Sequence, residues 1–262
     1  MQKNIISVKK IFILLIVSQV LFTNVFAGSK YFYSIDVNKT VEENLANLTG
    51  NEAVKAKVAE YGRYTFDYYF NYEGVKELQP LVDSFQPKGE SDYGKLLDVV
   101  KYFRQLNLKY GPRTEEGTTN QVLNIHKGYT QCFGAAIFAG KLLDKSNIEY
   151  RYVLSRYRDR GNLLKDATDG GHIYLEVKTD AGNWMEFDPT EIISYGRNWN
   201  YNKRIKNQIN AANKRGSVEM PDRNYKRNIV KKKSTEYREY VVSPVYKNGE
   251  IADSRLIIFN DL

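Results

Sequence analysis

The residues best suited to covalent chemistry are the single cysteine, one of the two histidines and an aspartate, in the order Cys132, His172, Asp188. A thiol attacks only as its thiolate, and free cysteine, with a pKa of about 8.5, is mostly protonated at neutral pH. A nearby imidazole or a helix N-terminus lowers that pKa. Cys132 precedes an apolar helical run, and His172 follows Gly170-Gly171 at the start of a predicted strand. The pattern therefore predicts a thiolate nucleophile, with Asp188 on an adjacent strand holding the imidazole.

The other site residues are less sharply defined by the sequence. The backbone amide of Cys132 is the first expected donor to an oxyanion, and Gln121, Asn124 or Tyr129 could supply a second. His126 lies just upstream of the cysteine, and we interpret it as structural or exposed rather than catalytic.

A single cysteine can also serve without catalysis. In an exported protein, an unpaired thiol is intermolecular, buried and inert, or chemically active, and composition alone favours the buried, inert thiol. Taken singly, Cys132, His172 and Asp188 each fit a structural role, whereas their joint order favours catalysis.

Metal and cofactor chemistry is not expected. A zinc site needs about four soft ligands, and one cysteine with two histidines provides too few. The sequence shows no calcium-binding loop. We therefore expect neither a metal nor a cofactor.

The elements that position these residues are predicted from hydrophobic periodicity. Apolar residues three and four apart predict a helix from Tyr93 to Leu106. A second helix is expected from Cys132 to about Ser146. Strands are expected at 148–155, 173–177 and 184–187, the last two joined by a turn at 180–183. In the tail, Asn248-Gly249 predicts a tight hairpin.

The first 27 residues resemble a secretory signal. Three lysines precede an apolar run from Ile11 to Phe22, and Val25-Phe26-Ala27 suits signal peptidase. The run is short for a membrane span, which needs about 20 residues, although an uncleaved anchor is the alternative. After cleavage we expect no membrane span, and localisation as secreted or periplasmic, within the cell envelope.

Four regions are expected: the signal at 1–27, a helical region at 28–90, a catalytic core at 91–200, and a basic segment with a β-hairpin at 201–262. Thr40-Val41-Glu42-Glu43 reads as a helix capping box in the second region. Residues 203–233 are strongly basic in a chain of net charge +8. They form either a solvated face or a binding site for an anionic envelope polymer. Within this basic segment Tyr225 is the only aromatic residue, which argues against nucleic acid as its partner.

Four segments, in two pairs, resemble the transglutaminase-like superfamily of papain-like thiol enzymes. They are GYTQCFGAA at 128–136 with IEYRYV at 148–153, and GHIYLEV at 171–177 with NWMEFDPT at 183–190. The chain departs from the common pattern at Thr130, where the family often has glycine, and at Tyr174, where it often has tryptophan. The resemblance covers roughly residues 92–192.

This resemblance implies an α+β fold. A nucleophile helix would pack on an antiparallel sheet, with an N-terminal helical lobe beside it and the basic tail as an appendage or a sheet extension. It also implies a Cys132, His172, Asp188 triad that acts on a protein or peptide carboxamide through a thioester. Water as acceptor would make the enzyme a peptidase, amidase or deamidase, which we favour. A lysine amine would make it a crosslinking transglutaminase, and a binding module without turnover is the opposing hypothesis.

Overall fold

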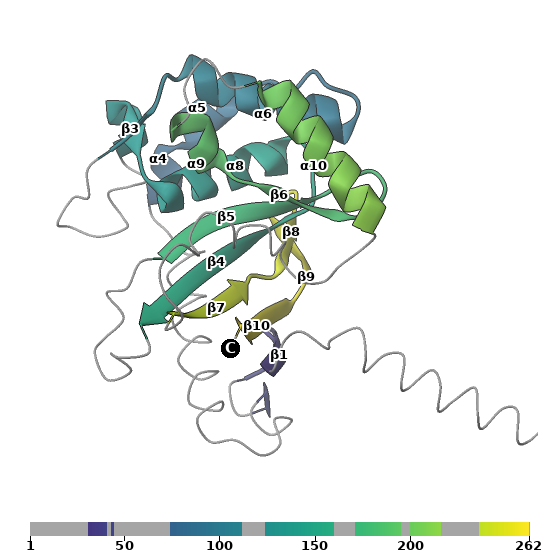
Figure 1. Ribbon diagram of the computed structural model, residues 1–262. Coiled ribbons are helices and arrows are strands. Elements are labelled where there is room, and N and C mark those ends of the chain that lie inside the picture. The colour runs from purple at the N-terminus through teal and green to yellow at the C-terminus, as the bar shows by residue number, and fades with distance from the viewer. Residues whose placement is uncertain are drawn as a thin grey trace, which may run out of the picture.

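The computed structural model describes residues 31–40, 43–44, 74–111, 124–159, 171–194, 200–215 and 236–261. Within them, helices gather on one face of a mixed-length antiparallel sheet (Figure 1). This confirms the predicted α+β fold, with the helix that carries Cys132 packed on the sheet. In the described part of the chain, every helix is too short or too polar to cross a bilayer. The predicted signal, 1–27, lies outside the described residues.

The main sheet has eight strands, and its continuous order is β1-β10-β7-β4-β5-β6. Their bounds are β1 Tyr31–Asp36, β4 Tyr150–Asp159, β5 Gly171–Lys178, β6 Trp184–Phe187, β7 Glu236–Val242, β8 Val245–Lys247, β9 Glu250–Asp253 and β10 Arg255–Asp261. All its pairings are antiparallel, and the short hairpin β8–β9 joins the sheet through β4. A second, parallel sheet consists of β2 Lys109–Tyr110 and β3 Tyr129–Thr130.

The helices lie at the end of the molecule that carries β5 and β6 (Figure 1). They are α4 Gly74–Glu77, α5 Gln79–Ser84, α6 Asp92–Gln105, the 3-10 turn η1 Asn124–Lys127, α8 Cys132–Lys145, α9 Pro189–Ser194 and α10 Tyr201–Arg215. Ser91 caps α6 by accepting the Gly94 backbone N–H. Asn107, with φ of 50°, takes the left-handed conformation that ends that helix.

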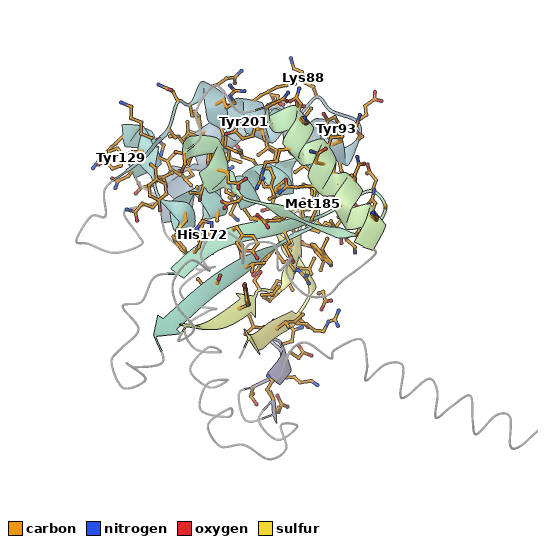
Figure 2. The ribbon with its side chains drawn as sticks, viewed as in Figure 1. Lys88, Tyr93, Tyr129, His172, Met185 and Tyr201 are labelled. Carbon is orange, nitrogen blue, oxygen red and sulfur yellow. The ribbon has the colours of Figure 1, made fainter. Side chains whose placement is uncertain are left out.

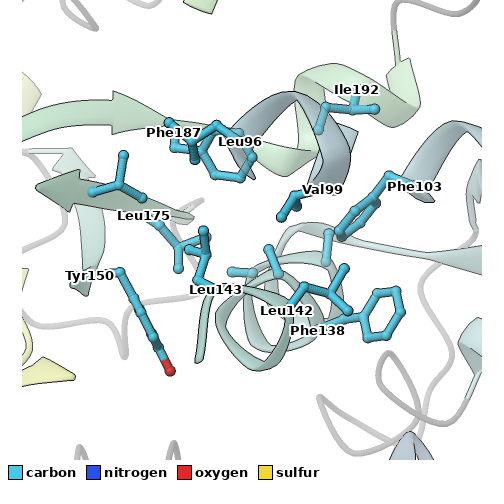
Figure 3. Close-up of a cluster of buried hydrophobic side chains, with 14 of the residues drawn as sticks. Leu96, Val99, Phe103, Phe138, Leu142, Leu143, Tyr150, Leu175, Phe187 and Ile192 are labelled. Atoms are coloured by element: carbon cyan, nitrogen blue, oxygen red, sulfur yellow. The ribbon is translucent and has the colours of Figure 1, made fainter. Parts of the chain in front are cut away.

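The core forms between α6, α8, α9 and strands β4 to β6. Figure 3 shows Leu96, Val99 and Phe103 of α6 facing Phe138, Leu142 and Leu143 of α8. Gly140 lets α8 approach β4 closely, because a Cβ there would lie 2.3 Å from the Tyr152 hydroxyl oxygen. Burial of these side chains holds α8, and with it Cys132, in a fixed position over the sheet.

The N-terminal region differs from the prediction. Residues 28–90 were expected to be helical, but 31–36 form β1, which pairs with β10. The helix prediction is wrong for this segment because its partner strand is more than 200 residues away, so no local pattern marks the pairing. The capping box is confirmed: Thr40 Oγ1 accepts the Glu43 N–H, and Glu43 Oε2 accepts the Thr40 N–H. The aromatic residues at 66–72 lie outside the described residues.

The C-terminal strands belong to the main sheet. Of the two arrangements open for the tail, a sheet extension is observed, since β7 lies between β4 and β10. The hairpin at Asn248-Gly249 is confirmed, with φ of 54° and 83°. The basic segment is helical over α10, which packs on α6 and β6, while 216–235 lie outside the described residues.

Candidate active site

Cys132 is the first residue of α8. Gln131 before it is extended, with φ of −118° and ψ of −173°, so the helix begins abruptly at the cysteine. The backbone N–H groups of the first helical turn have no carbonyl partner within the helix, and no acidic residue occupies that turn. The helix N-terminus therefore favours a negative charge on the sulfur.

His172 and Asp188 meet through the pairing of β5 with β6. His172, labelled in Figure 2, is the second residue of β5, and Asp188 comes directly after the last residue of β6. The imidazole Nε2 lies 2.7 Å from Asp188 Oδ2. The other carboxylate oxygen, Oδ1, accepts the Thr190 N–H at 2.9 Å and so caps the start of α9. Asp188 is 8% exposed, and its two hydrogen bonds fix the direction in which it faces the ring.

Because Asp188 holds Nε2 of the His172 ring, the other nitrogen, Nδ1, is the one left for the sulfur. The imidazole hydrogen-bonds the Cys132 side chain, and the Ile173 backbone N–H donates a second hydrogen bond to the same sulfur. Burial raises the pKa of the Cys132 thiol, but the hydrogen bond and charge of His172 and the Ile173 amide outweigh it, so the net pKa is lowered. Burial lowers the pKa of His172, yet Asp188 and Cys132 together raise it to about 10. The two shifts together favour a thiolate–imidazolium pair at neutral pH.

The structure adds Tyr110, which the sequence did not mark as a site residue. Its phenol hydrogen-bonds both the side chain and the backbone amide of Cys132. Burial and the neighbouring Cys132 raise the pKa of the phenol, so the hydroxyl keeps its proton. Tyr110 ends the two-residue strand β2, which no sequence periodicity marks.

A short backbone ladder holds Tyr110 beside the cysteine. Tyr110 is in register with Thr130, two residues before Cys132. The Gly111 N–H bonds the Thr130 carbonyl at 2.9 Å, and Gln131 Nε2 donates to the Gly111 carbonyl at 3.0 Å. The segment that ends at Tyr110 and the segment that leads into α8 therefore move as one unit.

The other predicted site residues lie farther from the sulfur or outside the described chain. Gln121 lies outside the described residues. Tyr129 is half-buried on β3, with its ring against Gly111. Asn124 is buried in η1, and His126 is exposed with Nε2 2.6 Å from the Glu77 carbonyl oxygen. The structure thus places Tyr110, rather than Tyr129, in hydrogen-bond contact with the cysteine.

A metal centre finds no support in the described ranges. No group of three or more His, Cys, Asp or Glu side chains in them converges as metal ligands would.

Comparisons with known proteins place this geometry in context. Residues 79–189, which include Tyr110, Cys132, His172 and Asp188, match the family model of the transglutaminase-like superfamily. The chain is similar to a solved structure described as "a Putative Cysteine Protease from Cytophaga hutchinsonii", with 15% identity and a TM-score of 0.35, over 87% of this chain and 70% of that one. It is also similar to "a TGase", with 15% identity and a TM-score of 0.33, over 56% of this chain and 41% of that one. A search of curated proteins found no match.

Proposed function

We propose that the protein is a cysteine-dependent acyl-transfer enzyme that opens peptide or glutamine carboxamides through a thioester, since residues 79–189 match the transglutaminase-like family model. The observation that carries the proposal is the chain of contacts from Cys132 through His172 to Asp188, at the start of a buried helix. Its order and geometry match what a thiol nucleophile requires: a base in contact with sulfur and a carboxylate behind the base.

The first half-reaction uses the groups around the sulfur. The Cys132 thiolate attacks the carboxamide carbon, and the carbonyl oxygen becomes an oxyanion. We propose that the Cys132 backbone N–H and the Tyr110 O–H bind this oxyanion, because the phenol is in hydrogen-bond contact with both the side chain and the backbone amide of Cys132. In the structure the Tyr110 phenol oxygen accepts the hydrogen bond of the Cys132 backbone N–H. The phenol must therefore shift before the substrate oxygen can accept that hydrogen bond. The imidazolium of His172 then gives its proton to the leaving nitrogen, and the C–N bond breaks.

The second half-reaction releases the acyl group. Neutral His172 takes a proton from the acceptor, which attacks the thioester carbon and expels the Cys132 thiolate. Asp188 keeps the Nε2–H of the ring directed at itself, which leaves Nδ1 facing the sulfur and the acceptor. We propose water as the acceptor, so that the enzyme is a peptidase, amidase or deamidase. A lysine amine in the same place would make it a crosslinking transglutaminase.

Mass spectrometry of a glutamine-containing peptide library separates these outcomes. The library is incubated with the protein, with and without methylamine. Conversion of amide to acid indicates deamidation, shortened peptides indicate proteolysis, and methylamine adducts indicate acyl transfer to amines. Cys132→Ala should remain folded by circular dichroism and lose all three products, and retained product formation in that variant would refute the thioester mechanism.

Tyr110→Phe tests the second oxyanion donor. The substitution keeps the ring and removes only the hydroxyl. Loss of one such donor lowers kcat by roughly 10²–10³-fold, and we expect a fall in that range with little change in KM. Tyr129→Phe is the matched control, and it should keep near-normal kcat. A faster Tyr110→Phe enzyme would show instead that the phenol only obstructs the cysteine.

A further inference from the structure

A surface groove lies between the C-terminal end of α6 and α9, and Tyr110 is one of its lining residues. Its cavity of about 340 Å³ is lined by residues that include Phe103, Arg104, Lys109, Tyr110, Ile192 and Ser194. This volume is at the lower end of the roughly 300–1,000 Å³ typical of ligand pockets. We call it the α6–α9 groove.

Tyr110 connects the α6–α9 groove to the reacting atoms. The same side chain forms one wall of the groove and hydrogen-bonds Cys132. A substrate whose carboxamide lies at Cys132 therefore has its neighbouring residue beside the phenol, at the mouth of the groove.

The groove has an apolar floor and a cationic rim. Phe103 and Ile192, which are 2% and 6% exposed, form part of the floor. Arg104 and Lys109 on the rim are exposed. The Arg104 guanidinium lies 5.4 Å from the centre of the Tyr201 ring, which holds the plane of its five N–H donors. Among the described lining residues there is no carboxylate.

The nearest acid on α9 does not offset these cations. Glu191 is ion-paired with Arg204 of α10. Burial raises the pKa of Glu191 to about 7, although Arg204 opposes the shift, so its negative charge is partly lost near neutral pH. The described residues that line the groove therefore carry positive charge from Arg104 and Lys109.

We propose that the α6–α9 groove is the substrate subsite next to the reactive carboxamide, and that it selects acidic peptides. An aliphatic stem such as that of glutamate contacts the floor, while its carboxylate lies between Arg104 and Lys109. Arginine binds carboxylates through paired N–H donors, which gives the subsite direction as well as charge. This inference rests on the proposed function, because it locates the reactive amide at Cys132.

Binding to the Cys132→Ala protein tests the subsite without turnover. Three N-acetylated, C-amidated pentapeptides carry a central glutamine flanked on both sides by Glu, Leu or Lys. Calorimetric titration should give a Kd for the Glu peptide roughly three- to tenfold below that of the Leu peptide, with the Lys peptide weakest. Raising the salt should reduce the difference. Equal affinities, or no binding of the Glu peptide at millimolar concentration, would overturn the proposal.

Variants then locate the preference in the groove. Arg104→Gln/Lys109→Gln should abolish the preference for Glu, whereas Lys214→Gln, an exposed lysine at the far end of α10, should keep it. Ser194→Trp should fill the groove and weaken all three peptides. A preference that survives both changes would place the acidic selectivity elsewhere.

Turnover by the protein with Cys132 intact separates this inference from the proposed function. Thiol-dependent conversion of all three peptides at equal kcat/KM would refute the acidic subsite and support the proposed enzymatic function. Selective binding of the Glu peptide without any conversion would support the acidic subsite and refute the proposed enzymatic function.

Discussion

At the scale of single residues, the site is a linear relay of hydrogen bonds. Asp188 has one carboxylate oxygen on the ring of His172 and the other on the backbone of α9. Because both oxygens are bonded, the carboxylate cannot turn away from the ring without breaking the cap of α9. The Cys132 sulfur, in turn, is hydrogen-bonded by the His172 imidazole and by the Ile173 backbone N–H. Each group is therefore oriented by the next one outward, which is the arrangement a preformed nucleophile needs.

Asp188→Asn should change the pH dependence of the cysteine. Asp188 is the principal group that raises the pKa of His172 to about 10 against the effect of burial. Without its charge, burial dominates and the imidazolium loses its proton at a lower pH. The alkaline limb of kcat/KM, where the acid that protonates the leaving nitrogen is lost, should move below pH 10.

Alkylation by iodoacetamide provides a second measure of that variant. A weaker imidazolium stabilises the thiolate less, so the rate at pH 6 should fall, by about tenfold for each unit that the thiol pKa rises. Thr190→Ala is the control, since only its backbone N–H bonds Asp188. An unchanged alkaline limb in Asp188→Asn would mean that Asp188 does not set the protonation of the ring.

At the scale of elements, the nucleophile helix and the sheet could be predicted, whereas the oxyanion side of the site could not. Helix α8 and strand β6 were predicted within one residue because their apolar residues recur at regular spacing. Strand β2 has two residues and exists only through its ladder with β3, which is separated from it by 18 residues of chain. Tyr110 was missed for that reason: its role depends on a pairing rather than on a local pattern.

Gly111→Ala should disturb this ladder. A Cβ at Gly111 would lie 2.4 Å from Cδ2 and 3.0 Å from Cβ and Cγ of the Tyr129 ring. Overpacking of this kind typically costs about 1–3 kcal/mol, and we expect Tm to fall by several degrees. Tyr110 should move with the strand, so kcat should fall as well. Both are measured by thermal unfolding and peptide turnover.

The double variant Gly111→Ala/Tyr129→Ala is the control for that clash. Removing the ring makes room for the new methyl group, so the double variant should recover turnover relative to Gly111→Ala alone. If the two substitutions simply add, contact with the ring is not what requires glycine at this position.

At the scale of the whole molecule, the transglutaminase-like segment and the C-terminal elements share one core and one sheet. The family match ends at residue 189, yet α10 packs on α6 and β6, and Tyr201 Oη donates to the Glu191 carbonyl at 2.9 Å. Strand β7 covers the long edge of β4, and Val153 of β4 is buried with Val242 of β7. The sequence placed a boundary near residue 200 because composition changes there, but composition does not report which strands pair.

A chain that ends at Asn200 should therefore fail to fold. It would lose α10 and the strands that pair with β4, leaving a ten-residue strand as an open edge. We expect insoluble protein, or a soluble fraction without a cooperative thermal transition by circular dichroism. A sharp transition near that of the full chain would show that residues up to 200 fold alone.

The pairing of β1 with β10 also determines when the main sheet can be completed during synthesis. Tyr31 is in register with Asn260, so the first strand of the sheet cannot find its neighbour until the ribosome has made more than 200 further residues. At the roughly 5–20 residues per second of synthesis, that wait lasts tens of seconds. Contacts this distant in sequence are also slow to form afterwards. The chain therefore cannot complete its main sheet while it is still being synthesised.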